Sequence, residues 1–397
     1  MKRIKQAVIL AGGQGTRLKP FTNEHPKPMY AFNGKPFIEY LIEQVKSFGI
    51  EEVVLLLGYR ADEIEAYLGD GKKYEMRIIY HITPVVYDTG NRVAAAMDLL
   101  NEDFLLMYCD NYCPIDFQKL EYDYNMNNAE VQITGYLNED GYTKDNLMTS
   151  SDGRVLVYDK KRITQGLKGV DIGYALINKE AIQYIKDMEG TFNFEEVVYP
   201  RCISKQKLCV TLTKHRYYSI GSWQRIELTK RFFNNMKTVF LDRDGTINRK
   251  PPKACYVEKK EDFVWLEGAK EAILRLKQNN YRVILVSNQP GIARGNLNEE
   301  TLAEIHDKMQ SELKQEMGTT IDAIYYCPHN WDEGCNCRKP KPGMLYQAQK
   351  DYSLDLTKCI LIGDDERDVE AGNQAGCVCY QVTEEKSLLD IVNDILD

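Results

Sequence analysis

The sequence lacks the features that mark several common functional classes. It has no apolar run that approaches the length of a membrane span, for which about 20 residues are needed. Its 51 Lys and Arg residues form no clustered stripe, and with 59 Asp and Glu residues they leave a formal net charge of -8. It also has no low-complexity segment and no short repeat. We therefore expect neither a membrane nor a nucleic acid as a partner, and small molecules as substrates.

A signal peptide and a disulfide framework are also missing from the pattern. The apolar residues 7–10 are too few for the hydrophobic part of a signal peptide and end in glycines. The 11 cysteines are odd in number and scattered in spacing, which predicts a reducing, cytoplasmic location. We expect Cys377 and Cys379, in a strand-like run, to be structural and to point to opposite faces. Homo-oligomer formation is left open.

Short apolar runs alternate with helical patterns through most of the chain, which is typical of parallel α/β architecture. A length of 397 residues suggests two or three domains, and the strand–helix rhythm starts afresh at Lys237. We predict two tandem Rossmann-like, three-layer α/β domains, at residues 1–235 and 236–397. Strands are expected at 6–10, 52–57, 77–80, 103–108, 130–136, 155–158, 171–177, 237–241, 282–286, 323–326, 359–363 and 377–382, and helices at 36–48, 62–68, 92–99 and 223–234.

Four metal-binding side chains fall within one polar loop, at residues 327–337. Cys327 and His329 form a Cys-x-His pair, and Cys335 and Cys337 form a Cys-x-Cys pair. Thiolates and a neutral imidazole suit tetrahedral Zn²⁺, and four protein ligands leave no position for water, so we expect a structural zinc ion. The alternative is that these cysteines are small buried hydrophobes, but the loop is too polar for burial to explain them.

A glycine-rich turn follows the first expected strand and contains Gly12, Gly13 and Gly15. Glycines directly after a strand let backbone N–H groups close on a phosphate, although a tight surface turn has the same composition. No Gly-Lys-Ser/Thr follows, so the turn is not a P-loop. The turn also does not match the dinucleotide-binding pattern, because Leu18 stands where that pattern needs a small residue.

Two cations and a carboxylate are expected near this turn. Arg17 follows it, Lys27 lies in His-Pro-Lys-Pro-Met, and Asp110 ends a strand where a metal bridging phosphates would lie. The run L-A-G-G-x-G-T-R-L followed by P-K-P-M resembles the signature of the sugar-nucleotidyltransferase family, over roughly residues 4–233. The resemblance implies that a sugar 1-phosphate attacks the α-phosphorus of a nucleoside triphosphate and releases pyrophosphate. Positioning and charge neutralisation would be the main contributions of the protein.

The same resemblance implies individual roles, with one departure. Ser219 stands where the family has its second metal-binding Asp, and a hydroxyl is a poorer Mg²⁺ ligand than a carboxylate. One possibility is that Asp110, the triphosphate and water hold the metal. The other is that this domain is catalytically weak and serves as a regulatory module that binds a nucleotide or a sugar. The resemblance assigns the triphosphate to Gly12, Gly13, Arg17 and Lys27, a further part in substrate binding to Gly15, the base to Thr89 and Gly90, Mg²⁺ to Asp110, and the sugar phosphate and sugar to Lys160 and Gly173.

Two aspartates, Asp242 and Asp244, follow the strand that opens the second predicted domain. Side chains at i and i+2 of an extended chain point to the same side, so both carboxylates can face one pocket. An acidic turn with no chemistry is the alternative. Ser287 and Asn288 end the next strand, and Asp364 ends another. Because the carboxyl ends of parallel strands meet at one edge, we expect these side chains to converge.

This order of residues, with Lys339 after the cysteine loop, resembles the haloacid dehalogenase superfamily of phosphatases, from roughly residue 237 to the C-terminus. The resemblance implies that Asp242 attacks phosphorus, while Asp244 protonates the leaving oxygen and then activates water. The sequence has no long insertion between these residues, so we expect little or no cap domain over the active site. Asp365 and Asp368 are expected to lie behind the site or in solvent. Mg²⁺ is assigned to Asp242, the backbone carbonyl of Asp244 and Asp364, and substrate contacts to Thr246, Ser287, Asn288, Arg338 and Lys339.

Within the superfamily, Cys-Pro-His followed by Cys-x-Cys-Arg-Lys-Pro-x-Pro-Gly-Met resembles heptose 1,7-bisphosphate phosphatases, with histidinol-phosphate phosphatases as the competing resemblance. Removal of the 7-phosphate leaves heptose 1-phosphate, which a nucleotidyltransferase can consume. The two resemblances imply a bifunctional enzyme of nucleotide-activated heptose synthesis. The first domain resembles guanylyltransferases for D-glycero-α-D-manno-heptose 1-phosphate, with GTP expected by analogy. Another hexose 1-phosphate, or a regulatory first domain on a heptose or histidinol phosphate phosphatase, stays an alternative.

Overall fold

The computed structural model describes residues 2–252 and 255–397. The chain forms two compact units, Met1–Phe233 and Asn234–Asp397. This division falls two residues before the boundary expected at residue 235. Each unit has its own central sheet, with a hydrophobic core on each face of it. Within the described residues, no helix is both long enough and apolar enough to cross a membrane.

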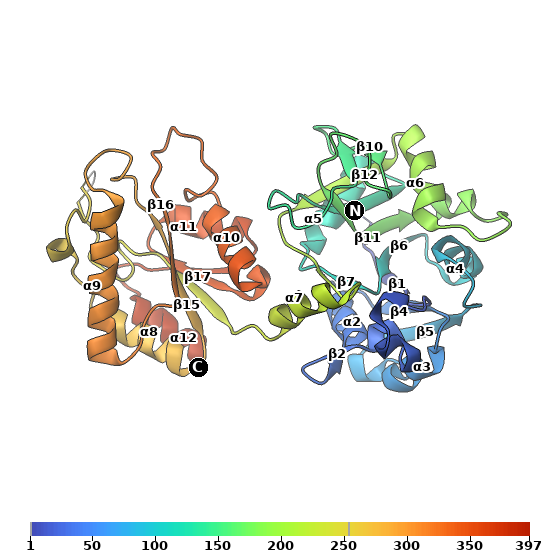
Figure 1. Cartoon of the computed structure of the whole chain (residues 1–397), viewed down its shortest axis with the longest axis horizontal. Coiled ribbons are helices and arrows are strands. Elements are labelled where there is room, and N and C mark those ends of the chain that lie inside the picture. Colours follow the sequence, from blue (N-terminus) through green and yellow to red (C-terminus); the bar gives the residue numbers. More distant parts are fainter. Residues whose placement is uncertain (1, 253–254) are drawn as a thin grey trace. The chain divides into compact units, whose positions relative to one another are not determined.

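A seven-stranded sheet forms the centre of the first unit (Figure 1). The strands β1, β4, β5 and β6 are parallel, and β11 runs antiparallel to both of its neighbours. The central strands β1 and β4 are buried on both faces, so they read as continuous apolar runs. The spatial order is β12 (Leu208–Thr213), β8 (Val131–Tyr136), β11 (Val170–Asn178), β6 (Asp103–Tyr108), β1 (Gln6–Leu10), β4 (Glu52–Leu57) and β5 (Arg77–Ile82).

Helices cover both faces of this sheet because side chains alternate between the faces along each strand. Ile9 packs into the core formed with α2 (Phe37–Ser47), α3 (Ala61–Leu68), α5 (Phe117–Asn127) and α7 (Trp223–Phe233). Val8 packs into the core on the opposite face, formed with α4 (Thr89–Ala95) and α6 (Phe194–Ser204). Short elements complete the unit: α1 (Phe21–Glu24), and the strand pairs β2 (Ala31–Phe32) with β3 (Lys35–Pro36), β7 (Asn111–Tyr112) with β13 (Tyr218–Ser219), and β9 (Leu147–Thr149) with β10 (Val155–Tyr158).

The second unit is a five-stranded, wholly parallel sheet between two helical layers (Figure 1). α8 (Ala269–Gln278), α9 (Glu299–Met317) and α12 (Leu388–Leu396) pack on the face that carries Leu241. α10 (Gly343–Tyr352) and α11 (Glu366–Gln374) pack on the face that carries Phe240 and Leu361. The spatial order is β16 (Ala323–Cys327), β15 (Arg282–Asn288), β14 (Thr238–Leu241), β17 (Ile360–Gly363) and β18 (Val378–Gln381).

The predicted α/β class is confirmed, and two local expectations are wrong. The helix expected at 92–99 begins at Thr89, because the Asp88 side chain accepts a hydrogen bond from the Thr89 N–H and caps it. It ends at Ala95, and a 3-10 turn (Met97–Leu99) follows. Cys377 and Cys379 pack against the same core rather than opposite faces, since residues i and i+2 of a strand share a face.

Candidate active sites

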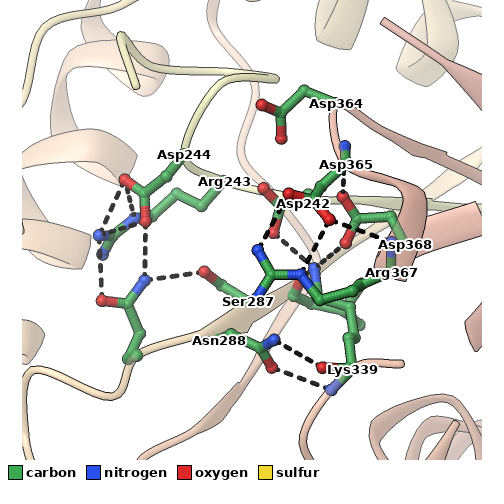
Figure 2. Close-up of polar contacts among 12 residues, drawn as sticks. Asp242, Arg243, Asp244, Ser287, Asn288, Lys339, Asp364, Asp365, Arg367 and Asp368 are labelled. Atoms are coloured by element: carbon green, nitrogen blue, oxygen red, sulfur yellow. Dashed lines mark hydrogen bonds and ion pairs between the residues drawn. The ribbon is translucent and has the colours of Figure 1, made fainter. Parts of the chain in front are cut away.

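The carboxyl ends of β14, β15 and β17 converge at one edge of the second sheet. β14 leads into Asp242 and Asp244, β15 ends in Ser287 and Asn288, and β17 ends directly before Asp364. β14 lies between the other two strands, so the three ends surround one pocket. Figure 2 shows the side chains that meet there. The pocket is lined by Asp242, Asp244, Lys250, Ser287, Asn288, Lys339, Asp364, Asp365, Arg367 and Asp368.

Lys339 is buried between two carboxylates of this pocket (Figure 2). Its Nζ lies 2.6 Å from Asp242 Oδ1 and 2.5 Å from Asp368 Oδ1, and donates a 2.8 Å hydrogen bond to the Val286 carbonyl. Burial raises the pKa of Asp242 to about 7, an effect that the positive charge of Lys339 opposes and the negative charge of Asp368 increases. The cation is therefore placed where it favours the ionised form of Asp242.

Asn288 fixes the backbone at Lys339. Its Nδ2 donates to the Lys339 carbonyl and its Oδ1 accepts from the Lys339 N–H, both at 3.0 Å. Both bonds reach the main chain, so strand β15 positions a cation that comes from a loop 51 residues later. The amide group expected to contact substrate is used, in this structure, to hold Lys339.

Asp244 turns away from Lys339 and toward Arg243 (Figure 2). The side chains of three residues donate hydrogen bonds to it. Arg243 Nη2 and Gln289 Nε2 each lie 2.9 Å from Asp244 Oδ2, and Asn248 Nδ2 lies 3.0 Å from Oδ1. Burial would raise the pKa of Asp244, but the Arg243 charge and these hydrogen bonds lower it below its usual range. Sequence reasoning did not find Arg243, Asn248 or Gln289.

Three carboxylates form a cluster at the pocket. One oxygen each of Asp242, Asp364 and Asp368 lies within 4.8 Å of the others. Gly245 has φ 98°, and a side chain there would stand 2.3 Å from Asp364 Oδ2, so glycine is needed for this approach. Carboxylate oxygens are the ligands that Mg²⁺ prefers, so this set fits the expected metal. Asp368, expected behind the site or in solvent, is 2% exposed and belongs to the cluster.

Two residues expected to bind substrate lie outside the lining of this pocket. Thr246, in the turn that follows Asp244, is 1% exposed, and its N–H donates to the Arg243 carbonyl. Arg338 donates a 3.3 Å hydrogen bond to the carbonyl of His329. In this structure the side chain of Arg338 therefore supports the cysteine loop.

Cys327, His329, Cys335 and Cys337 form a second cluster, with their ligand atoms within 4.8 Å of one another. Cys327 Sγ lies 3.6 Å from both His329 Nδ1 and Cys335 Sγ, and Cys337 Sγ lies 3.3 Å from His329 Nδ1. The three cysteines are free thiols. A tetrahedral ion with bonds of about 2.3 Å separates its ligands by about 3.8 Å, so this donor set fits a metal ion.

A further pocket opens at the carboxyl ends of β1 and β6 in the first unit. It is lined by Gly12, Gly13, Gly15, Lys27, Thr89 and Asp110, among others. Gly12 faces the buried guanidinium of Arg92, which donates a 3.1 Å hydrogen bond to its carbonyl, and a side chain there would stand 2.3 Å from that group. A side chain at Gly13 would meet no atom of the described residues within 4 Å. Packing therefore requires glycine at position 12 but not at position 13.

Lys27 and Asp110 form an ion pair in this pocket, with Nζ 2.6 Å from Oδ2. Burial would lower the pKa of Lys27 and raise that of Asp110, but each charge stabilises the other, so the pKa of Lys27 is raised and that of Asp110 lowered. Arg17, in the 3-10 turn Thr16–Leu18, is exposed nearby. Three of the residues expected to hold the triphosphate and metal therefore lie at one edge of the sheet.

Ser219 lies beside Asp110. Strand β13 pairs Ser219 with Asn111, and the Ile220 N–H donates a 3.0 Å hydrogen bond to the Asp110 carbonyl. The Ser219 hydroxyl is buried and accepts a 3.0 Å hydrogen bond from the Gly221 N–H. The residue that corresponds to the expected second metal ligand therefore lies next to Asp110, but its side chain is a hydroxyl rather than a carboxylate.

Of the remaining residues expected at this site, Thr89 lines the pocket, whereas Gly90, Lys160 and Gly173 lie outside its lining. Thr89 Oγ1 accepts a 2.9 Å hydrogen bond from the Phe194 N–H, which ties α4 to α6. Lys160 lies outside the pocket lining, with Nζ 3.9 Å from carboxylate oxygens of Glu195 and Glu196. Glycine is required by packing at two other positions: a side chain at Gly90 would stand 2.4 Å from Phe192, and one at Gly173, where φ is 80°, would stand 2.8 Å from Tyr108.

The two folds and their donor sets define an enzyme with a nucleotidyltransferase domain followed by a phosphatase domain. Residues 6–145 match the family described as nucleotidyl transferase, and residues 237–381 match that described as polynucleotide kinase 3 phosphatase. The chain is similar in fold to the inositol-1-phosphate CTP transferase from T. maritima, with a TM-score of 0.50 and 17% identity, over 56% of this chain and 92% of that one.

Two curated relatives match the second domain. The D-glycero-beta-D-manno-heptose-1,7-bisphosphate 7-phosphatase of Bordetella bronchiseptica is 44% identical over 147 residues, or 37% of this chain and 80% of that protein. The D-glycero-alpha-D-manno-heptose-1,7-bisphosphate 7-phosphatase of Photorhabdus laumondii is 39% identical over 150 residues, or 36% and 80%. The chain belongs to this family of heptose bisphosphate phosphatases through its second domain and carries a nucleotidyl transferase domain before it. The predicted combination of two enzyme classes is confirmed.

Proposed function

We propose that the chain is a bifunctional enzyme of nucleotide-activated heptose synthesis. The second domain would remove the 7-phosphate of heptose 1,7-bisphosphate, and the first would transfer GMP from GTP to the resulting heptose 1-phosphate. The observation that carries this proposal is that one chain joins a heptose bisphosphate phosphatase to a nucleotidyltransferase, so that the product of one domain belongs to the substrate class of the other. We also propose a cytoplasmic location, where nucleoside triphosphates are available.

In the phosphatase reaction, an oxygen of Asp242 attacks phosphorus and the bond from phosphorus to the sugar oxygen breaks. Asp244 gives a proton to that oxygen, then takes one from the water that attacks the phospho-aspartate, and the bond to Asp242 breaks to release phosphate. Lys339 favours the ionised form of Asp242 and would counter the charge of the transferred group. Because Arg243 and its neighbours favour ionised Asp244, substrate binding must loosen this clamp before Asp244 can carry the first proton.

Metal ions complete the phosphatase domain in this proposal. Asp242, Asp364 and the backbone carbonyl of Asp244 would hold Mg²⁺, with Asp368 beside them. A bound Mg²⁺ would neutralise charge on the transferred phosphoryl group. Zn²⁺ in the cysteine loop would be structural and would order the segment that leads, two residues after Cys337, to Lys339.

In the nucleotidyl transfer, an oxygen of the sugar 1-phosphate attacks the α-phosphorus, and pyrophosphate leaves. The N–H groups of Gly12 and Gly13 and the side chains of Arg17 and Lys27 would neutralise the triphosphate. Asp110 would hold Mg²⁺. Thr89 and Gly90 would face the base, and Gly15 would shape the turn. Lys160 would reach the sugar phosphate by leaving its two glutamate neighbours, and Gly173 would lie against the sugar.

A coupled assay tests both halves of the proposal. The full chain is given heptose 1,7-bisphosphate with each nucleoside triphosphate in turn, and phosphate and pyrophosphate are measured separately. We expect phosphate release with every nucleotide and pyrophosphate release with GTP. Phosphate without pyrophosphate under all conditions would contradict the transferase half and favour a regulatory first domain. Faster phosphate release from histidinol phosphate would contradict the heptose half.

A further inference from the structure

Lys250 acts as a counter-ion at the phosphatase pocket. Its Nζ donates a hydrogen bond to Asp364 Oδ2 and lies 3.8 Å from Asp365 Oδ2. The Lys250 side chain is 55% exposed, whereas that of Asp364 is 13% exposed. An exposed, flexible cation is therefore held at the pocket by a carboxylate that lies largely inside it.

The pocket has two other cations, Arg367 and Lys339. Arg367 pairs with a carboxylate outside the expected metal site, and Lys339 is buried within that site. Arg367 donates to both oxygens of Asp365, at 2.8 and 2.9 Å. Lys339 is 4% exposed and lies within contact distance of two carboxylates. Lys250 differs from Arg367 because its close partner, Asp364, belongs to the three-carboxylate cluster that suits Mg²⁺. It differs from Lys339, whose two partners also belong to that cluster, because its own side chain is largely exposed.

We propose that Lys250 and Mg²⁺ occupy Asp364 in turn, and that Lys250, once displaced by the metal, binds the phosphate of the substrate that is not cleaved. The second part rests on the proposed function, since heptose 1,7-bisphosphate carries a phosphate at each end. An ammonium group and a divalent cation repel each other at one carboxylate oxygen. After displacement, the long side chain of Lys250 still reaches the pocket mouth, where its ammonium group has lost its closest anion. A lysine ammonium is a compact point charge with three donors, which suits a phosphate.

The two parts of this proposal predict effects of opposite sign. Removal of the Lys250 charge removes a competitor of Mg²⁺, so the metal should bind more tightly. The same change removes a ligand of the second phosphate, so the bisphosphate should bind more weakly. A residue with a purely structural role would not improve one affinity while it weakens the other.

The test compares Lys250→Met with the wild-type full chain. Calorimetric titration with MgCl2, without substrate, should give a dissociation constant at least about threefold lower in the variant. The KM for phosphate release from heptose 1,7-bisphosphate should rise about tenfold, as expected for loss of a charged hydrogen bond. The KM for a sugar monophosphate should not change. Lys250→Arg should restore the bisphosphate KM, and Lys259→Met, at an exposed lysine outside the pocket lining, should behave as wild type.

Two results would overturn the inference: an unchanged or weaker Mg²⁺ affinity in Lys250→Met, or an equal change of KM for both substrates. Absence of phosphate release from either substrate by the wild-type chain would overturn the proposed function instead. The calorimetric comparison would then still decide whether Lys250 competes with the metal.

Discussion

Lys339 Nζ lies 2.6 Å from Asp242 Oδ1, although 97 residues separate the two in the chain. Asp242 is delivered by strand β14, whereas Lys339 follows the cysteine loop and is tied to strand β15 through Asn288. The contact therefore depends on the sheet and on the loop together. Changes in either should be visible in the phosphatase reaction.

Asp242→Asn should lower phosphate release by about 10³-fold or more, because an amide cannot form the phospho-enzyme. Pyrophosphate release from heptose 1-phosphate and GTP should stay at the wild-type rate, because the two pockets belong to separate compact units. Both products are measured on the same preparation. A parallel loss of both activities would contradict independent sites.

Cys335→Ser should remove the bound metal, because a hydroxyl replaces one of four clustered ligands. Elemental analysis should then find no stoichiometric zinc, and phosphate release should fall about tenfold or more as the segment before Lys339 loses its order. Cys255→Ser is the matched control, since Cys255 is an exposed free thiol outside the cluster. Full zinc content in the Cys335 variant would rule out this site.

Gly12→Ala and Gly13→Ala should differ in kind. The new methyl group at position 12 would stand 2.3 Å from Arg92, so the first domain should lose about 1–3 kcal/mol of stability in thermal unfolding. At position 13 no atom in the described part of the chain lies within 4 Å of the added methyl group, so stability should change little. The KM for the nucleotide should rise, because the methyl group approaches the phosphates. A wild-type KM in Gly13→Ala would remove that residue from the triphosphate site.

His306 should make the second domain sensitive to acid. Burial, and then the charge of Arg243, lower its pKa to about 4, whereas Asp244 opposes the shift. The unfolded chain protonates His306 below about pH 6.5, whereas the folded chain does so only below about pH 4. The contribution of neutral His306 to the free energy of unfolding is therefore complete above about pH 6.5. It is lost as the pH falls from 6.5 to 4, by up to about 3 kcal/mol.

Urea unfolding of the wild type and of His306→Leu at pH 7.5 and pH 4.5 measures this contribution. Other titrating groups affect both proteins alike, so the difference between them isolates His306. The variant should lose less stability on acidification. Equal losses would show that His306 titrates normally in the folded chain.

Ser219→Asp should lower the Mg²⁺ concentration needed for half-maximal pyrophosphate release about tenfold, because a carboxylate beside Asp110 is a better ligand than a hydroxyl. Ser219→Ala provides the matched variant without a ligand atom and should need as much Mg²⁺ as the wild type or more. Loss of activity in the Asp variant alone would show that the metal is not held at this position.

Much of the fold was predictable because buried parallel strands read as continuous apolar runs, and both ends of β1, β4 and β6 agree with the expected ones. The sequence also predicted that Asp242, Asp364 and Lys339 lie at one pocket, and all three line it. Asp242 and Asp364 follow strands whose ends converge at one edge of the sheet, and Lys339 follows the cysteine loop. Asp368 was expected behind the site or in solvent, and it is buried against Lys339; nothing in its local sequence shows that α11 turns its carboxylate toward this lysine.

The sequence by itself determined which chemical groups are available and in what order the strands deliver them. The motifs around Gly12, Asp242 and Cys327 define two phosphate-handling domains. Only the tertiary structure decided the partners of those groups: Arg243 and Gln289 clamp Asp244, and Lys250 neutralises Asp364. The physical reason is that the charge state of a carboxylate depends on burial and on donors within a few ångströms, and these donors come from separate strands and loops that meet only in the folded chain.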